Sequence, residues 1–182
     1  MPQILNMGGK AFQELGVEDS GGTKLICLSG NVNHRGTFEV PIGGVTLRDI
    51  IFDPEFGGGI PDGKELKAYH LGGQSGPIGF PEQLDTRYDH TSLKKQGLSI
   101  GSGAGVVLDD TVCIIDYLKK VSEFFLHESC GKCVPCREGN RQLYMILHKF
   151  ANGLATEKDF ERMERLSFTM ATASSCGLGQ SA

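Results

Sequence analysis

The sequence lacks the long apolar run that a membrane-spanning helix requires. Such a helix needs roughly 20 consecutive apolar residues, and no segment of the 182-residue sequence comes close to that length. The first residues also lack the charged and then apolar layout of a secretory signal. We therefore expect no direct membrane insertion, and the sequence leaves open a place at the periphery of a membrane complex.

Positive charge is scarce as well. Lysine and arginine number 18 against 22 aspartates and glutamates, which gives a formal net charge of −4. Nucleic-acid-binding domains usually carry a basic patch, so we expect no nucleic-acid partner. Tryptophan is absent, and hydrophobic residues make up 39% of the chain, which is a lean supply for a core. The length suggests one or two small domains.

What the sequence does contain is a cluster of cysteines in residues 128–139, which read ESCGKCVPCREG. Cys130, Cys133 and Cys136 are three positions apart, and Cys176 follows far downstream. A 4Fe-4S cluster needs four thiolates around a compact body. A CxxCxxC loop can enclose one side of that body, and the fourth ligand must then come from elsewhere. We therefore predict that these four cysteines bind a 4Fe-4S cluster.

The residues between these cysteines suit such a site. Gly131 allows the loop to turn and brings a backbone N–H group near sulfur, and Pro135 has the φ angle and missing N–H that suit a helix start. Lys132 and Arg137 can offset the negative charge of the cluster, which helps to set its potential. We predict that Gly131, Lys132 and Arg137 surround the cofactor.

Other roles for the cysteine cluster remain open. A zinc-stabilised binding module without redox activity is the main alternative, although structural zinc sites more often pair two CxxC or Cys/His units. Disulfides fit poorly in a chain without a secretory signal, and a thioredoxin-like pair would need a βαβ context. Cys27 and Cys113 lie in apolar stretches, so we expect both to be buried thiols. Reduced thiols indicate a reducing compartment such as the cytoplasm.

The first part of the chain has the pattern of a small α+β sheet. After a weakly patterned lead-in at 1–22, two apolar runs with a turn between them predict a β-hairpin within 23–43. Thr46 is placed to cap a helix, and residues 66–71 and 106–108 read as further strands. The sequence between residues 82 and 99 shows no regular pattern and is expected to be mostly irregular.

The second part of the chain has helical periodicity. Asp109 or Asp110 could cap a first helix, a second is expected to start near Pro135, and a third after Thr156 with Phe160 on its buried face. We therefore predict a lead-in at 1–22, a sheet domain at 23–108 and a helical domain at 109–182.

Two glycine-rich loops could suggest nucleotide binding. The loop at 101–105 resembles part of GxGxxG but is followed by a predicted strand, and the loop at 72–79 lacks the Gly-Lys-Ser/Thr ending of a P-loop. We interpret both as turns. A sensor role for the sheet domain is a third hypothesis, but no convergent polar or aromatic cluster in 23–108 identifies a ligand.

The cysteine block at 128–139 and the segment SCGLGQ at 175–180 resemble the flavin- and NADH-binding subunit of respiratory complex I. They also resemble the electron-input subunits of NAD(P)-linked hydrogenases and formate dehydrogenases. Residues 30–40, 57–63 (GGGIPDG) and 100–109 (IGSGAGVVLD) match the same family. The resemblance implies a ubiquitin-like β-grasp domain of the soluble-ligand-binding type, followed by a helical bundle that holds one 4Fe-4S cluster through the four cysteines.

The resemblance also implies a redox role. In such subunits NADH reduces FMN, and the cluster passes single electrons to iron–sulfur subunits of the same complex. The flavin and NADH domain precedes the region that matches, and its RGGAGFP-type signature is not found here. We therefore expect FMN and NAD(H) to bind only in a missing upstream domain, and we do not expect this chain alone to oxidise NADH. Gln74 and Pro77 depart from the family pattern in a loop that we take as structural.

Overall fold

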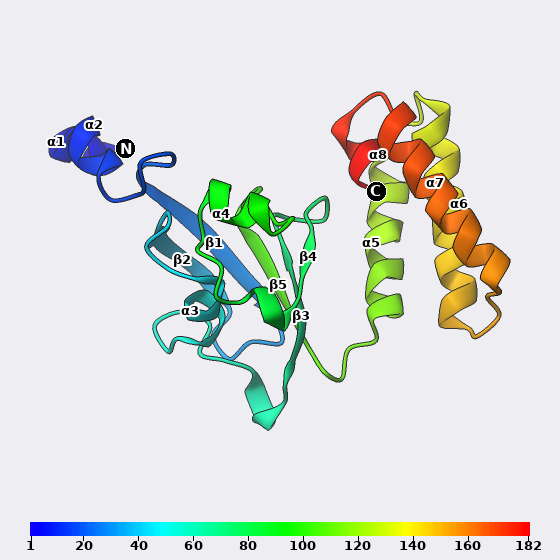
Figure 1. The fold of residues 1–182 in the computed structure, drawn as a ribbon, viewed down its shortest axis with the longest axis horizontal. Coiled ribbons are helices and arrows are strands. Elements are labelled where there is room, and N and C mark those ends of the chain that lie inside the picture. The colour runs from blue at the N-terminus through cyan, green and yellow to red at the C-terminus, as the bar shows by residue number, and fades with distance from the viewer. The chain divides into compact units, whose positions relative to one another are not determined.

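The computed structural model describes residues 1–182, which form two compact units, Met1–Thr111 and Val112–Ala182. The first unit is built around a β-sheet, and the second is entirely helical (Figure 1). This arrangement confirms the predicted fold class, an α+β sheet domain followed by an all-α domain.

The sheet of the first unit has five strands in the order β2-β1-β5-β3-β4. The strands are β1 Thr23–Gly30, β2 Gly36–Pro41, β3 Leu66–Leu71, β4 Ile78–Gly79 and β5 Ala104–Asp109. Strands β1 and β2 form the predicted antiparallel hairpin. Strand β5 pairs in parallel with β1 and antiparallel with β3, which also pairs with β4. A hairpin beside a parallel central pair is the topology of a β-grasp sheet.

The helix α3, Leu47–Phe52, begins where the sequence predicts it. The side chain of Thr46 accepts a hydrogen bond from the backbone N–H of Asp49 at 3.2 Å, and the Asp49 carboxylate accepts one from the Thr46 N–H at 2.8 Å. This reciprocal capping satisfies two backbone donors that the helix itself leaves unpaired. The apolar face of α3 joins the core of the unit through Leu47, Ile50 and Ile51.

The remaining helices of the first unit are short. They are α1 Pro2–Met7, α2 Gly9–Gln13, α4 His90–Lys95 and the 3-10 turns η1 Pro61–Gly63 and η2 Pro81–Gln83. Helix α4 and turn η2 lie in a segment that we expected to be irregular. Asp89 caps α4 by accepting a hydrogen bond from the N–H of Ser92 at 2.6 Å, and Leu93 is its only buried side chain. One buried residue gives no periodicity, so the sequence pattern could not indicate this helix.

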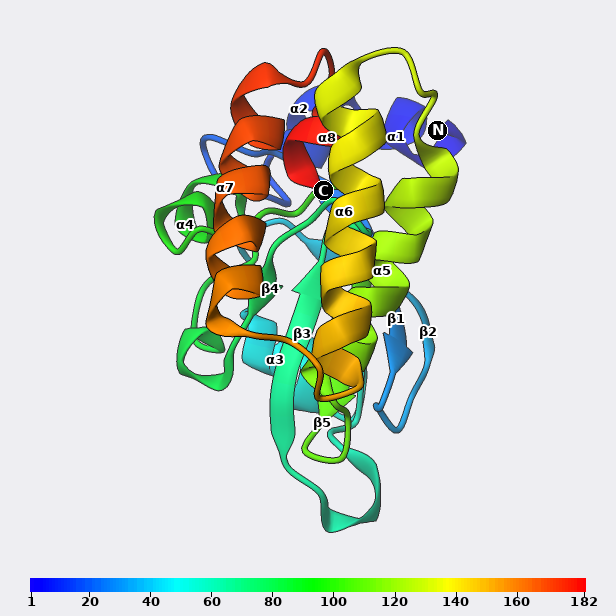
Figure 2. The ribbon, with the colours of Figure 1, turned by 90° about the vertical axis from the view of Figure 1, so that its right-hand side faces the viewer.

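The second unit consists of four helices, α5 Ile114–Glu128, α6 Val134–Ala151, α7 Glu157–Ala173 and α8 Gly177–Ser181. Helices α5 and α6 run side by side, and α7 lies against α6 (Figure 2). Their buried residues include Phe125, Leu143, Ile146 and Met170. None of the helices in the chain combines the length and the apolar character needed to cross a bilayer.

The structure corrects the predicted start of α5. The helix begins at Ile114, because Asp109 ends strand β5 and its carboxylate accepts a hydrogen bond from the N–H of Thr111 at 3.0 Å. This bond closes a turn and does not cap a helix. Cys113 immediately precedes the first helical residue and is exposed, so the prediction of a buried thiol there is wrong.

Two other predictions of burial are also wrong. Cys27 is exposed, because strand alternation turns its neighbours Ile26 and Leu28 toward the core. Phe160 is 48% exposed although we expected it on the buried face of α7, where Met170 is 1% exposed. The third helix does begin after Thr156, as predicted.

The start of α7 is stabilised by Asp159. Its carboxylate accepts hydrogen bonds from the Lys149 ammonium at 2.7 Å and from the N–H and hydroxyl of Thr156 at 3.0 and 2.8 Å. These bonds, that of Lys149 first, lower the pKa of Asp159 from 3.8 to about 2. Because the pKa is depressed in the folded state, the ionised carboxylate stabilises the fold above the ordinary pKa, and this contribution is lost as the pH falls toward 2.

We therefore expect Asp159→Asn to flatten the acid dependence of stability. In urea unfolding of the metal-free protein, the free energy of unfolding of the wild type should fall more steeply between pH 4 and pH 2 than that of the variant. Glu157→Gln removes a carboxylate from the same helical turn and serves as the control. Parallel pH profiles of the wild type and Asp159→Asn would contradict this prediction.

Candidate metal centre

The first three cysteines of the predicted site lie where α5 passes into α6. Helix α5 ends at Glu128, Cys130 lies in the connecting loop, Cys133 is the residue before the first turn of α6, and Cys136 lies within that turn. Gly131 has a φ angle of 74°, a left-handed conformation that costs glycine little. The sharp turn at Gly131 allows the loop to bring the three side chains to the same end of the helical unit.

The fourth cysteine comes from the end of α7. Cys176 is the residue before the first turn of α8. A Cβ atom on Gly179 would lie 2.7 Å from the Cβ of Cys136, so the backbone of α8 approaches α6 as closely as only glycine permits. Figure 2 shows the α5–α6 loop and the loop after α7 at the same end of the helical unit. All four cysteines line one cavity of about 380 Å³, together with Glu128, Lys132, Ser175 and Leu178.

A single metal ion and an iron–sulfur cluster require different arrangements of the cysteine sulfurs. Across residues 1–182, no three His, Cys, Asp or Glu side chains lie close enough together to share one metal ion. A tetrahedral zinc ion would draw all its sulfurs to about 2.3 Å from one point. In a 4Fe-4S cluster each thiolate binds a different iron, so the sulfurs stay farther apart around a larger body. Four cysteines line this cavity, which is the number of thiolates that a 4Fe-4S cluster requires.

The surroundings of Cys133 favour a thiolate. Hydrogen bonds from the backbone N–H groups of Ser175 and Cys136 lower the pKa of Cys133 below its usual value of 9.0. The bond from Ser175 is the largest contribution and comes from the segment that carries Cys176. The loop that carries Cys176 therefore contacts the Cys133 sulfur through its backbone, and both loops line the same cavity. A thiolate is the form of cysteine that binds metals.

The three residues predicted to surround the cofactor occupy different places. Lys132 lines the cavity beside the cysteines. Arg137 lines an adjoining cavity with Gly131, and its guanidinium donates a hydrogen bond to the Gly131 carbonyl oxygen at 2.7 Å. The same guanidinium pairs with Glu138 at 2.9 Å. Arg137 therefore braces the turn of the cysteine loop.

Sequence reasoning missed two polar neighbours of Cys136. The hydroxyl of Ser129 lies 3.3 Å from the Cys136 sulfur and accepts a hydrogen bond from the Gly131 N–H. The amide nitrogen of Asn140 lies 3.3 Å from the same sulfur. Asn140 follows Cys136 by four positions, a spacing that places both on one face of a helix. That spacing was the available signal for Asn140.

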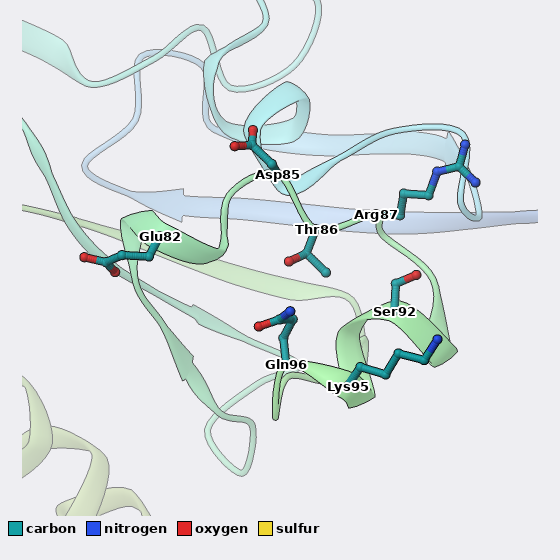
Figure 3. A pocket seen from close by; sticks show the side chains of 7 residues that line it. All are labelled: Glu82, Asp85, Thr86, Arg87, Ser92, Lys95 and Gln96. Carbon is teal, nitrogen blue, oxygen red and sulfur yellow. The ribbon is translucent and has the colours of Figure 1, made fainter.

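A second cavity, of about 450 Å³, lies in the first unit and is lined by Glu82, Asp85, Thr86, Arg87, Ser92, Lys95 and Gln96. Its side chains point in different directions and do not converge on a common point (Figure 3). Asp85 is already paired with Arg48 at 2.6 Å, which lowers the pKa of that carboxyl. The mixed charges and lack of convergence make this cavity a weaker candidate than the cysteine site.

The segment that contains the cysteine site is similar to a known family of iron–sulfur regions. Residues 116–182 match the family described as the NADH-ubiquinone oxidoreductase-F iron–sulfur binding region. Among similar proteins, the NADP-reducing hydrogenase subunit HndC of Solidesulfovibrio fructosivorans is 40% identical over 99% of this chain and 36% of its own length. The F 2 subunit of the NADH-quinone oxidoreductase of Rhizobium meliloti is 38% identical over 100% of this chain and 42% of its own length.

A solved structure is also similar to nearly the whole of this chain. A chain of an NAD⁺-reducing NiFe hydrogenase in the H2-reduced state superposes with a TM-score of 0.85 and 34% sequence identity. The match covers 99% of this chain and 30% of the hydrogenase chain. The protein described here therefore spans less than half the length of the relatives that it matches.

Proposed function

We propose that this chain is the electron-transfer part of an NADH dehydrogenase-type subunit, because it is similar over nearly its whole length to the F subunits of NADH-quinone oxidoreductases and to a hydrogenase subunit. It would relay single electrons from FMN through a 4Fe-4S cluster to partner subunits. The observation that carries this proposal is the convergence of four cysteines from two distant loops on one cavity, inside the segment that matches the iron–sulfur family.

Each cysteine would bind one iron of the cluster through its sulfur, and the bound cluster would supply one-electron chemistry. The ligands are Cys130, Cys133, Cys136 and Cys176. The surrounding residues would hold these sulfurs in place and offset their negative charge. Lys132 is placed for the second task because it lines the cavity, and Arg137 fixes the loop through Gly131.

The parts of the relatives that this chain does not match would supply the rest of the reaction. We propose that FMN and NAD(H) bind there, so that residues 1–182 alone do not oxidise NADH. Residues 23–108 would form the β-grasp domain and 109–182 the cluster-binding domain. The partners would be other iron–sulfur subunits of a multi-subunit oxidoreductase. The reducing conditions that free thiolates require favour a cytoplasmic location, with attachment to a membrane only through such a complex.

The metal content tests this proposal against a zinc-stabilised module without redox activity. Protein purified without oxygen is expected to contain about four iron atoms and four acid-labile sulfides per chain, as the cluster formula requires. Reduction with dithionite should bleach its visible absorbance and produce a paramagnetic signal. Zinc alone, without sulfide, would contradict the electron-transfer function and support the zinc module. Aerobically prepared protein is unsuitable because oxygen can strip iron from exposed clusters.

A further inference from the structure

Asn140 is a buried amide beside the cysteine site. It lies in α6 and is 1% exposed, among the most buried polar side chains of the chain. Burying an amide without hydrogen-bond partners carries a large free-energy cost, so such a residue is stable only where its polar atoms are satisfied. The position of its amide nitrogen therefore indicates what this side chain does.

The amide nitrogen of Asn140 contacts Cys136 twice. It lies 2.9 Å from the Cys136 carbonyl oxygen and 3.3 Å from the Cys136 sulfur. A carbonyl oxygen can only accept, so the atom facing it must be the NH₂ group of the amide. The two hydrogens of that group can then serve the two acceptors. The contact with the Cys136 carbonyl oxygen therefore requires that the NH₂ group of Asn140, and not its amide oxygen, faces the Cys136 sulfur.

Cys136 is the most enclosed of the four cysteines. It is 5% exposed, whereas Cys130 and Cys176 are exposed and Cys133 is intermediate. A hydrogen bond to a buried sulfur is not weakened by competition from water, and charge acts over a longer range where water is excluded. Among the four candidate ligands, Cys136 is therefore the one at which a single donor has the strongest electronic effect.

We infer that Asn140 is a positioning residue that tunes the reduction potential of the cluster through Cys136. Adding an electron increases the negative charge on the sulfur ligands, and an N–H donor stabilises that charge. The bond from Asn140 therefore stabilises the reduced state more than the oxidised state and raises the potential. The inference rests on the proposed function, because it requires a redox-active cluster on Cys136.

The test is the midpoint potential of Asn140→Leu in the 182-residue protein with its cluster, measured by a redox titration followed by electron paramagnetic resonance. Leucine has the same branched arrangement of side-chain heavy atoms but no hydrogen-bond donor. At a fixed applied potential, the ratio of reduced to oxidised cluster should fall about tenfold, a shift of about 59 mV toward more negative values for a one-electron couple. Equal potentials in the two proteins, both fully loaded with iron, would overturn the inference.

A matched control separates this electronic effect from lost stability. Leu143 lies in the same helix and is also buried, but its side chain has no N–H group to donate to the Cys136 sulfur. Leu143→Ala should lower the free energy of unfolding and leave the potential unchanged. An equal shift of potential in Leu143→Ala would mean that loosening of the helix causes the change, which would also overturn the role of Asn140.

A measurement on the wild type decides the matter if Asn140→Leu fails to hold its cluster. Protein labelled with ¹⁵N only at asparagine should show a nitrogen hyperfine coupling in electron–nuclear double resonance of the reduced cluster, because Asn140 is the asparagine that contacts a cysteine sulfur. Absence of that coupling would refute the hydrogen bond. A wild-type protein that contains zinc and no iron would refute the proposed function. An iron-loaded protein without the nitrogen coupling would refute only the role of Asn140.

Discussion

Replacing Cys176 by alanine is expected to abolish the iron–sulfur absorbance and to lower bound iron at least about tenfold, since even changes beside a metal ligand cost 10- to 100-fold in affinity. Cys176 is the only candidate ligand that comes from the α7–α8 segment. Without it, three cysteines from one loop would face an open side of the cavity. Iron and sulfide analysis of anaerobically purified protein measures the loss.

The matched control is Cys113→Ala. Cys113 is also an exposed cysteine of the chain, but it does not line the cavity. This variant should retain its iron, sulfide and visible spectrum. An unchanged spectrum in Cys176→Ala would show that the fourth ligand is wrongly assigned, and equal losses in both variants would indicate an effect on folding.

The second large effect is expected at a residue that binds no metal. Gly179→Val should prevent cluster assembly, because a Cβ atom at this position would lie 2.7 Å from the Cβ of Cys136 and 2.6 Å from the Ser174 hydroxyl. Both neighbours are buried and belong to packed helices or their ends, so neither can move away freely. Helix α8 would be displaced and would carry Cys176 out of the cavity.

Gly177 provides the comparison for Gly179. A Cβ atom there would have no neighbour within 4 Å, although both glycines lie in α8. Gly177→Ala should therefore bind iron as the wild type does, whereas Gly179→Val should contain at least about tenfold less, a loss of the size caused by disturbing the surroundings of a metal ligand. Full iron loading of Gly179→Val would show that the close approach of α8 is not required for the site.

The parts of the structure that the sequence predicted are those that leave a periodic or spaced signal. The two apolar runs with a turn between them predicted the hairpin within 23–43, and Thr46 predicted the start of α3. The cysteine pattern predicted that four cysteines would come together, and all four line one cavity. Such patterns involve neighbouring residues or the chemistry of one residue type, so they predict structure without knowledge of how the chain packs.

The features that the sequence did not predict depend on how the folded chain packs and turns. Nothing near Phe160 distinguishes it from Met170, and only the packing of α7 against α6 decides which one is buried. The apolar context of Cys113 suggested burial, but the turn closed by Asp109 leaves it exposed. The four-residue spacing between Cys136 and Asn140 is visible in the sequence, but the role of Asn140 depends on the sulfur that lies 3.3 Å from its amide nitrogen in the folded helix.

The thiolate site is drawn wholly from the second unit of the chain. The cysteines, Lys132 and Asn140 all lie within Val112–Ala182, and the two loops that carry the ligands are linked by helices of that unit alone. All four proposed ligands of the cluster therefore come from the helical unit. We therefore expect the helical unit to keep all of its candidate metal ligands whichever domain it is joined to.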